Sequence, residues 1–173
     1  MQEFRLSGSG GQGLITAGII LAEAALMEGK EAVQSQSYGP EARGGASKAE
    51  VIIADQFIYH PKVVTPGIIL AMTQQAADKY SSDLATDGIL LIDEDLVPNP
   101  PKNAKVIKVP ITRLSTEKLG RALFANIIAL GLLVKVTGVV NYDTIKAVVA
   151  KRVPPAMVEK NMEALQIGFE SVE

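Results

Sequence analysis

The sequence predicts a three-layer α/β/α domain around a mixed, mostly parallel β-sheet. Short apolar runs alternate with longer segments of helical pattern, which is typical of a parallel sheet covered by helices. Two strand-like runs near residues 32 and 50 follow each other with no helix between them, so part of the sheet should be antiparallel. A length of 173 residues suits one domain, which we expect to span residues 1–173.

The first two thirds of the chain supply the predicted strands. Residues 4–6 run into a glycine cluster and predict a strand that ends in a tight turn. A helix is expected over Leu14–Met27, where Ala, Ile and Leu dominate and Gly29 stands at the position of a C-terminal cap. Further strands are expected at residues 32–34, 46–54, 67–72, 88–93 and 106–109, with a helix at 73–80.

The last third of the chain changes to a helical pattern. Helices are expected at residues 116–136, 142–150 and 155–169, the last beginning at Pro154-Pro155, since proline is tolerated in the first turn. No repeat, low-complexity segment or linker interrupts this order, which again favours one domain.

The composition excludes several classes of protein. The net charge is −2 and there is no basic tail, which argues against binding to nucleic acid. The absence of Cys excludes a disulfide framework, a thiolate-bound iron–sulfur cluster, a Cys-based zinc site and a Cys nucleophile. The first residues show no signal-peptide pattern, and the longest apolar stretch, residues 122–134, is too short to span a membrane. We therefore expect no membrane association, and a cytoplasmic location is compatible with the composition.

A glycine-rich loop follows the first predicted strand, with the sequence Gly8-Ser9-Gly10-Gly11-Gln12-Gly13. It fits the G-x-G-x-x-G pattern of Rossmann-like domains and lies between a strand and a helix, as that pattern requires. Residues without Cβ let the backbone approach an anion, and the free N–H groups of a helix start point toward it. The loop therefore predicts a ligand that carries phosphate.

Two other interpretations of this loop stay open. A dinucleotide site is one, but NAD-binding domains place an acidic residue at the end of the second strand, where this chain has Gln34-Ser35-Gln36. The other is a tight turn whose glycines permit close packing of helix on sheet and bind nothing.

A second loop has the sequence Ser37-Tyr38-Gly39-Pro40-Glu41-Ala42-Arg43-Gly44-Gly45. The planar guanidinium of Arg43 suits a carboxylate or a phosphate, and the two glycines after it permit backbone bending. Because both loops follow early strands, we expect them to lie together at one edge of the sheet. An internal pair between Glu41 and Arg43 that only stiffens the loop is the alternative.

The two loops together resemble those of the gamma subunit of 2-oxoacid:ferredoxin oxidoreductases. The sequence of the second loop is similar to that of the 2-oxoglutarate type. The resemblance continues at Asn126 and Gly131, in a helix similar to the family's central helix, and at Asn161, Ala164 and Gly168 near the end of the chain. It thus covers nearly the whole sequence.

The resemblance implies a division of labour. Such complexes decarboxylate a 2-oxoacid oxidatively, form an acyl-coenzyme A and reduce ferredoxin. Alpha and beta subunits and a ferredoxin-like delta subunit supply thiamine diphosphate with Mg²⁺ and the iron–sulfur clusters, while the gamma subunit is associated with the coenzyme A step. This chain is then expected to hold no cofactor and to catalyse nothing by itself. The residues implied at the coenzyme A site are those of the two loops: Gly8, Ser9, Gly10, Gly11, Gln12, Gly13, Tyr38, Glu41 and Arg43.

Two functions other than that of a gamma subunit are compatible with this sequence. A stand-alone NAD(P)- or FAD-dependent enzyme and a purely structural assembly subunit would both suit the glycine-rich loop.

His60 is the only His and precedes a proline, which favours a structural or solvent-facing role. The acidic run Asp93-Glu94-Asp95 follows a predicted strand and could attract Mg²⁺, but such a run is more often a solvated strand end, so we expect no metal site.

Overall fold

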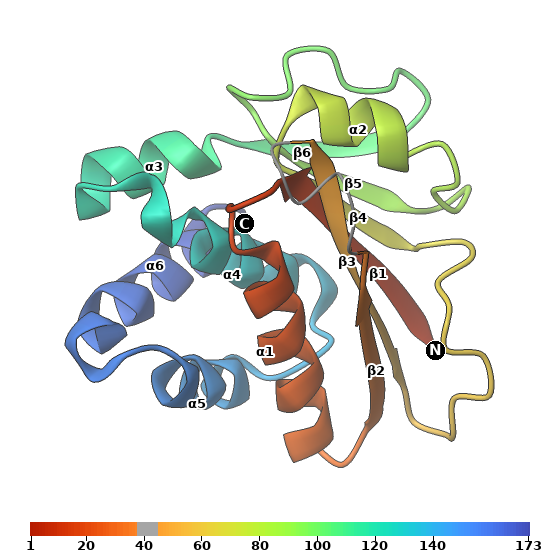
Figure 1. Ribbon diagram of the computed structural model, residues 1–173, viewed down its shortest axis with the longest axis horizontal. Coiled ribbons are helices and arrows are strands. Elements are labelled where there is room, and N and C mark those ends of the chain that lie inside the picture. Colours follow the sequence, from red (N-terminus) through yellow and green to blue (C-terminus); the bar gives the residue numbers. More distant parts are fainter. Residues whose placement is uncertain (38–44) are drawn as a thin grey trace.

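A computed structural model describes residues 1–37 and 45–173 of the chain (Figure 1). One six-stranded sheet runs through the molecule in the order β2-β3-β1-β4-β5-β6. The strands are β1 (Gln2–Ser9), β2 (Glu31–Gln36), β3 (Ala46–Ala54), β4 (Ile68–Ala71), β5 (Ile89–Asp93) and β6 (Lys105–Val109). The α-helices are α1 (Leu14–Met27), α2 (Gln74–Tyr80), α3 (Ile111–Leu119), α4 (Ala125–Thr137), α5 (Tyr142–Arg152) and α6 (Val158–Glu170).

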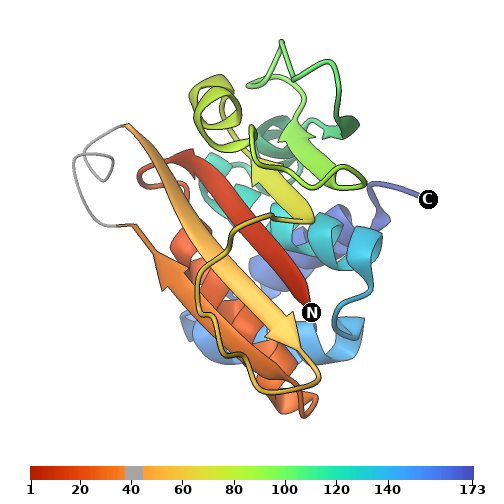
Figure 2. The ribbon, with the colours of Figure 1, turned by 90° about the vertical axis from the view of Figure 1, so that its right-hand side faces the viewer.

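The sheet is mixed, as the sequence predicted. Strands β1, β4, β5 and β6 are parallel neighbours, whereas β3 pairs antiparallel with both β1 and β2. The segment after β3, residues 55–67, crosses in front of the sheet to reach β4 on the other side of β1 (Figure 2). This crossing makes β1 a central strand, with the glycine-rich loop at its carboxyl end.

Helices cover the two faces of the sheet unequally. Figure 1 shows α1 and α3 to α6 on one face, while α2 lies on the other. Side chains alternate accordingly: Leu6, Leu70 and Leu91 belong to the large core under the five helices, whereas Ile69 and Leu90 belong to a smaller core on the α2 side. The three-layer α/β/α expectation is therefore confirmed, with one layer much thicker than the other.

The prediction of a single helix over residues 116–136 was wrong. Helix α3 starts earlier, at Ile111, and ends at Gly120, which has the left-handed conformation (φ +81°) typical of a helix C-cap. Arg121 is then extended, and a 3₁₀ turn over Ala122–Phe124 leads into α4. Leu119, Ala122 and Leu123 keep helical spacing across this break, so periodicity alone joined two helices that Gly120 separates.

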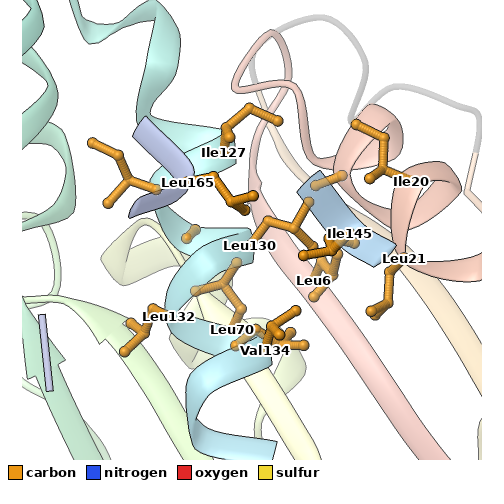
Figure 3. Close-up of a cluster of buried hydrophobic side chains, with 14 of the residues drawn as sticks. Leu6, Ile20, Leu21, Leu70, Ile127, Leu130, Leu132, Val134, Ile145 and Leu165 are labelled. Carbon is orange, nitrogen blue, oxygen red and sulfur yellow. The ribbon is translucent and has the colours of Figure 1, made fainter. Parts of the chain in front are cut away.

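Helix α4 is apolar on every side, and every residue from 127 to 134 is buried. Figure 3 shows Leu130 and Val134 of this helix among Leu6 and Leu70 of the sheet. On its other side α4 crosses α6 at two glycines. A Cβ on Gly131 would overlap the carbonyl oxygen of Leu165, and a Cβ on Gly168 would overlap that of Ile128. The two backbones thus touch directly, which only glycine allows.

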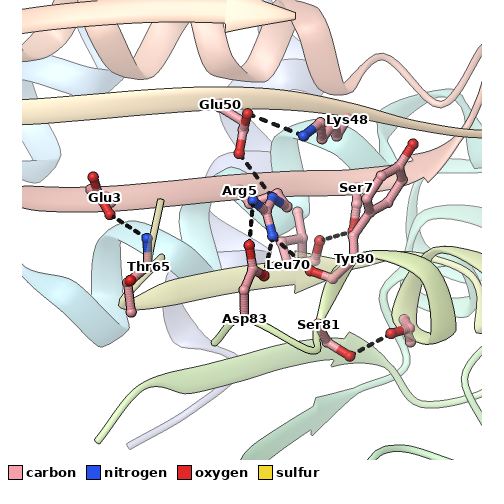
Figure 4. Close-up of polar contacts among 11 residues, drawn as sticks. Glu3, Arg5, Ser7, Lys48, Glu50, Thr65, Leu70, Tyr80, Ser81 and Asp83 are labelled. Atoms are coloured by element: carbon pink, nitrogen blue, oxygen red, sulfur yellow. Dashed lines mark hydrogen bonds and ion pairs between the residues drawn. The ribbon is translucent and has the colours of Figure 1, made fainter. Parts of the chain in front are cut away.

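A buried arginine joins the sheet to the turn after α2. Arg5 of β1 is 4% exposed, and its guanidinium donates to Glu50 of β3 at 2.9 Å, to the carbonyl of Tyr80 at 2.9 Å and to Asp83 in a two-pronged contact (Figure 4). Burial alone would raise the pKa of Asp83, but the contact with Arg5 outweighs it and holds that pKa below its ordinary value. Burial alone would lower the pKa of Arg5, but its two carboxylate partners raise it.

The first prediction concerns the glycine contact between α4 and α6. Gly131→Ala and Gly168→Ala should each lower the free energy of unfolding by about 3 kcal/mol or more, because a methyl group cannot fit against a backbone that has no room to move. Thermal or urea unfolding measures the change. Gly67→Ala is the matched control, since the nearest atom to its added methyl group is 4.0 Å away. Equal stability of all four proteins would contradict the close crossing.

The second prediction concerns Asp83. Asp83→Asn should lower the free energy of unfolding by about 1 kcal/mol near neutral pH, a figure kept small because the Asp83 side chain is 43% exposed. Because the folded-state pKa lies below the ordinary value of 3.8, the carboxylate's contribution is complete above that value and is lost as pH falls through the folded pKa. Urea unfolding should therefore show the two proteins converging as the pH is lowered below 3.8. Asp78→Asn, an exposed change of the same charge on α2, is the control.

Candidate functional site

The glycine-rich loop closes on itself through Gln12. The side-chain oxygen Oε1 of Gln12 accepts the backbone N–H of Ser9 at 2.7 Å, while the Gln12 N–H donates to the Ser9 carbonyl at 3.3 Å. The side chain lies across Gly8, where a Cβ would overlap Gln12 and would also stand 2.8 Å from Leu14 and 3.1 Å from Met72. Gly8 and Gln12 therefore fix the conformation of the turn through contacts within the loop itself.

Helix α4 holds the other end of this loop through Asn126. The side-chain amide of Asn126 donates to the Gly13 carbonyl at 3.1 Å and accepts the N–H of Ile127 at 2.9 Å. Gly13 has φ +76°, and a Cβ there would stand 2.6 Å from Nδ2 of Asn126. The sequence singled out Asn126 only through the family resemblance. Its partner lies 113 residues away, so no local pattern could indicate the contact.

The start of α1 faces the loop without a side-chain cap. Gly13 is the N-cap residue and supplies no capping side chain, and the first turn contains no acidic residue. The first N–H groups of a helix carry partial positive charge and favour an anion nearby. Gly11 is exposed, with φ +88° and open space where its Cβ would be. The exposed side of the loop can thus receive a ligand close to its backbone, while Gly8, Gln12 and Gly13 are engaged inside.

The second loop is described only at its two ends. Gly10 donates its N–H to the carbonyl of Gly45 at 3.4 Å, and the N–H of Ser37 donates to the carbonyl of Lys48 at 3.3 Å. These bonds bring the end of the second loop beside the first at the carboxyl end of β1. Tyr38, Glu41 and Arg43 lie outside the described residues, so their expected place beside the first loop stays a prediction.

The sheet order argues against a dinucleotide site. In the Rossmann fingerprint the acidic residue at the end of the second strand reaches the ribose of a dinucleotide bound on the first. Here β3 lies between β1 and β2, so Ser35 and Gln36 stand two strand spacings from β1, about 10 Å. Ser35 and Gln36 therefore have neither the acidic side chain nor the position that a dinucleotide requires.

The acidic run after β5 has a structural role. Asp93 is fully buried and accepts the backbone N–H groups of Asp95, Leu96 and Thr112 at 3.1, 3.3 and 2.8 Å. It thereby fixes the turn after β5 and the first turn of α3. Its neighbours Glu94 and Asp95 both form ion pairs with Arg113.

Within residues 1–37 and 45–173 no cluster of three or more His, Asp or Glu side chains is placed to bind a metal ion. In the same ranges no helix has the length and apolar character needed to cross a bilayer. His60 is exposed, in agreement with a solvent-facing position.

Comparisons with known proteins identify the family. The family model for pyruvate ferredoxin/flavodoxin oxidoreductase matches residues 3–171. The 2-oxoglutarate synthase subunit KorC of Methanocaldococcus jannaschii is 47% identical, over 98% of this chain and 92% of that protein. The crystal structure of a keto/oxoacid ferredoxin oxidoreductase gamma subunit from Geobacter sulfurreducens superposes with a TM-score of 0.89 at 51% identity, over 99% of this chain and 98% of that one.

A longer relative shows the same domain in another setting. The ketoisovalerate oxidoreductase subunit VorA of Methanothermobacter thermautotrophicus is 34% identical over 75% of this chain, but the match covers only 27% of that protein. The domain is thus part of a larger polypeptide there. The family model matches residues 3–171, and the chain is closely similar to a gamma subunit in sequence and structure, so it belongs to the pyruvate ferredoxin/flavodoxin oxidoreductase family, among its gamma subunits.

Proposed function

We propose that the chain is the non-redox gamma subunit of a 2-oxoglutarate:ferredoxin oxidoreductase. The complex would convert 2-oxoglutarate to succinyl-coenzyme A by oxidative decarboxylation and reduce ferredoxin. The observation that carries this proposal is the 47% identity to a 2-oxoglutarate synthase subunit over nearly the full length of both chains. The gamma-subunit structure at 51% identity supports the same place in such a complex.

The chemistry of the redox step belongs to other chains in this proposal. Without Cys, this chain offers no thiolate for an iron–sulfur cluster. Alpha and beta subunits would hold thiamine diphosphate with Mg²⁺, and a ferredoxin-like delta subunit the clusters, in a cytoplasmic complex. Thiamine diphosphate supplies the carbanion chemistry when it is bound in such a complex.

The gamma chain would contribute a surface for coenzyme A. The uncapped start of α1 and the exposed Gly11 favour a phosphate group at the first loop. From the second loop, Arg43 would pair with an anionic group of coenzyme A or of the 2-oxoacid, with Tyr38 and Glu41 beside it. A purely structural subunit is the second candidate, favoured by the way Gln12 closes the first loop internally. The sheet order disfavours a stand-alone NAD(P)- or FAD-dependent enzyme.

The third prediction tests the function of the complex. The purified chain alone should not reduce a viologen dye with 2-oxoglutarate and coenzyme A. The same assay with its alpha, beta and delta subunits should reduce the dye, and should prefer 2-oxoglutarate to pyruvate. Activity of the isolated chain, or of the complex without it at an undiminished rate, would contradict the proposal. A preference for pyruvate would contradict the substrate alone.

The fourth prediction separates a ligand-binding subunit from a structural one. Arg43→Ala in the assembled complex should lower kcat/KM by about 10- to 100-fold, because a charge-assisted hydrogen bond contributes roughly 1.5–3 kcal/mol. Arg43→Lys should restore little of this loss, since Lys cannot make a two-pronged contact. Steady-state kinetics with coenzyme A and 2-oxoglutarate varied in turn shows which substrate is affected. Arg152→Ala, at an exposed ion pair with Glu23 on the helical face, is the control. Unchanged kinetics in a complex that assembles normally would favour the structural subunit.

A further inference from the structure

Asn126 meets the glycine-rich loop with an amide group whose two polar atoms are both engaged. Its Nδ2 donates to the carbonyl of Gly13 at 3.1 Å, and its Oδ1 accepts the N–H of Ile127 at 2.9 Å. Only one orientation of the amide satisfies both contacts, because the reverse one would place oxygen against oxygen and N–H against N–H. Asn126 therefore acts on the loop as a hydrogen-bond donor, while its oxygen is held by its own helix, α4.

The carbonyl of Gly13 belongs to the peptide unit that begins α1. It also accepts the N–H of Ala17 at 3.2 Å, so this oxygen receives two hydrogen bonds, which is the number of its lone pairs. The carbonyl of Gly13 and the N–H of Leu14 lie in one planar trans peptide and point in opposite directions. A contact that fixes the carbonyl therefore also fixes the direction of the Leu14 N–H, the first N–H group of the helix.

The contact with Asn126 stands where an ordinary helix cap would be. A capping Ser, Asp or Asn accepts N–H groups of the first turn, but Gly13 has no side chain and no side chain of the described residues caps α1. A Cβ on Gly13 would stand 2.6 Å from Nδ2 of Asn126, so the amide fills the space in which a capping side chain would begin. Because Asn126 binds the carbonyl instead, the helix start is held in place while its first N–H groups stay available to an anion.

Asn126 is supported by the core of the protein. It is the second residue of α4, and its neighbours Ala125 and Ile127 are 6% and 2% exposed. Asn126 itself is half-buried, whereas Gly11 is exposed and has open space around it. The residue can thus hold the loop from the protein side while a ligand approaches the exposed side.

We propose that Asn126 is a positioning residue for coenzyme A. Through the carbonyl of Gly13 it sets the direction in which the first N–H groups of α1 face a phosphate group of coenzyme A, without touching that ligand itself. Its effect therefore falls on coenzyme A and not on the 2-oxoacid. This inference rests on the proposed function, because it takes coenzyme A as the ligand of the glycine-rich loop.

Calorimetric titration of the assembled complex with coenzyme A tests this role. Asn126→Ala, which removes the donor, should raise the Kd of coenzyme A by about 3- to 10-fold, the effect of one neutral hydrogen bond. Steady-state kinetics should show the same rise in KM for coenzyme A, with kcat and the KM for 2-oxoglutarate unchanged. Thr137→Ala is the matched control at the other end of α4. The Thr137 hydroxyl likewise donates to a carbonyl, that of Leu133, and accepts an N–H, that of Val139.

Hydrogen exchange distinguishes a positioning residue from a direct contact with the ligand. In the complex without coenzyme A, peptides that cover residues 8–14 should exchange faster in Asn126→Ala than in the wild type, because loss of the anchor frees the backbone of the loop. The same peptides should exchange at the wild-type rate in Thr137→Ala.

Asn126→Asp provides a second variant in case the alanine variant does not assemble. It keeps the shape of the side chain and the acceptor for the N–H of Ile127, and a negative charge in the first turn stabilises a helix. Its carboxylate offers no donor to Gly13, so the Kd of coenzyme A should again rise. The rise should persist at high salt, where repulsion between the new charge and the ligand is screened.

The proposed function and the role of Asn126 fail in different ways. If the wild-type complex does not bind coenzyme A, both are wrong. If the wild type binds and both Asn126 variants bind as tightly, or Thr137→Ala loses as much affinity, only the role of Asn126 is wrong. A loss of affinity without faster exchange would make Asn126 a direct contact, and an equal rise in the KM for 2-oxoglutarate would make its effect general. Either result overturns the proposal.

Discussion

Helix α4 is apolar on all sides, and the fold has to bury it completely. A surface helix would need a polar stripe, and residues 127–134 contain none. The sheet covers one side of α4, and α1, α3 and α6 surround the rest. At Gly131 and Gly168 the backbones of α4 and α6 touch directly, and this close approach leaves space for the other elements around α4. The thick helical layer on one face of the sheet follows from this requirement.

The same helix reaches the candidate site. Asn126 stands at the start of α4, where the helix emerges from the core, and its amide is bonded to the carbonyl of Gly13. The backbone of the glycine-rich loop is thereby tied to the most deeply buried element of the protein. Gln12 closes the loop from the other side. Its shape is therefore fixed before any ligand arrives, which limits the conformational cost of binding.

The two ends of the parallel strands differ in chemistry. At the carboxyl end of β1, glycines and an uncapped helix start expose backbone N–H groups, which suits a small anionic ligand. At the amino ends of the parallel strands, a groove of about 570 Å³ is lined by apolar side chains, among them Ile68 and Ile89, and by the carboxylates of Glu3 and Asp87. The surface at which we propose that coenzyme A binds thus lies at the carboxyl end of β1, away from this groove.

Much of the fold was predictable because it depends on local rules. Apolar periodicity indicated all six strands. The lack of a helical pattern in the sequence between the runs near residues 32 and 50 indicated the antiparallel pair. The glycine pattern located the first loop, since a turn from strand to helix needs residues without Cβ at fixed spacing. The break at Gly120 was missed because apolar periodicity continues on both sides of it and one glycine does not by itself end a helix.

What only the tertiary structure decided is which distant residues meet. Arg5 and Asp83 are 78 residues apart and Gly13 and Asn126 are 113 apart, and neither pair has a sequence pattern that links its members. The place of β3 between β1 and β2, which separates Ser35 and Gln36 from the glycine-rich loop, is likewise a property of the sheet and not of any strand. Local sequence determines turns and periodicity through backbone sterics and side-chain burial. Long-range pairs depend on packing that forms only when every element is in place, and the groove at the amino ends of the strands arises at that stage.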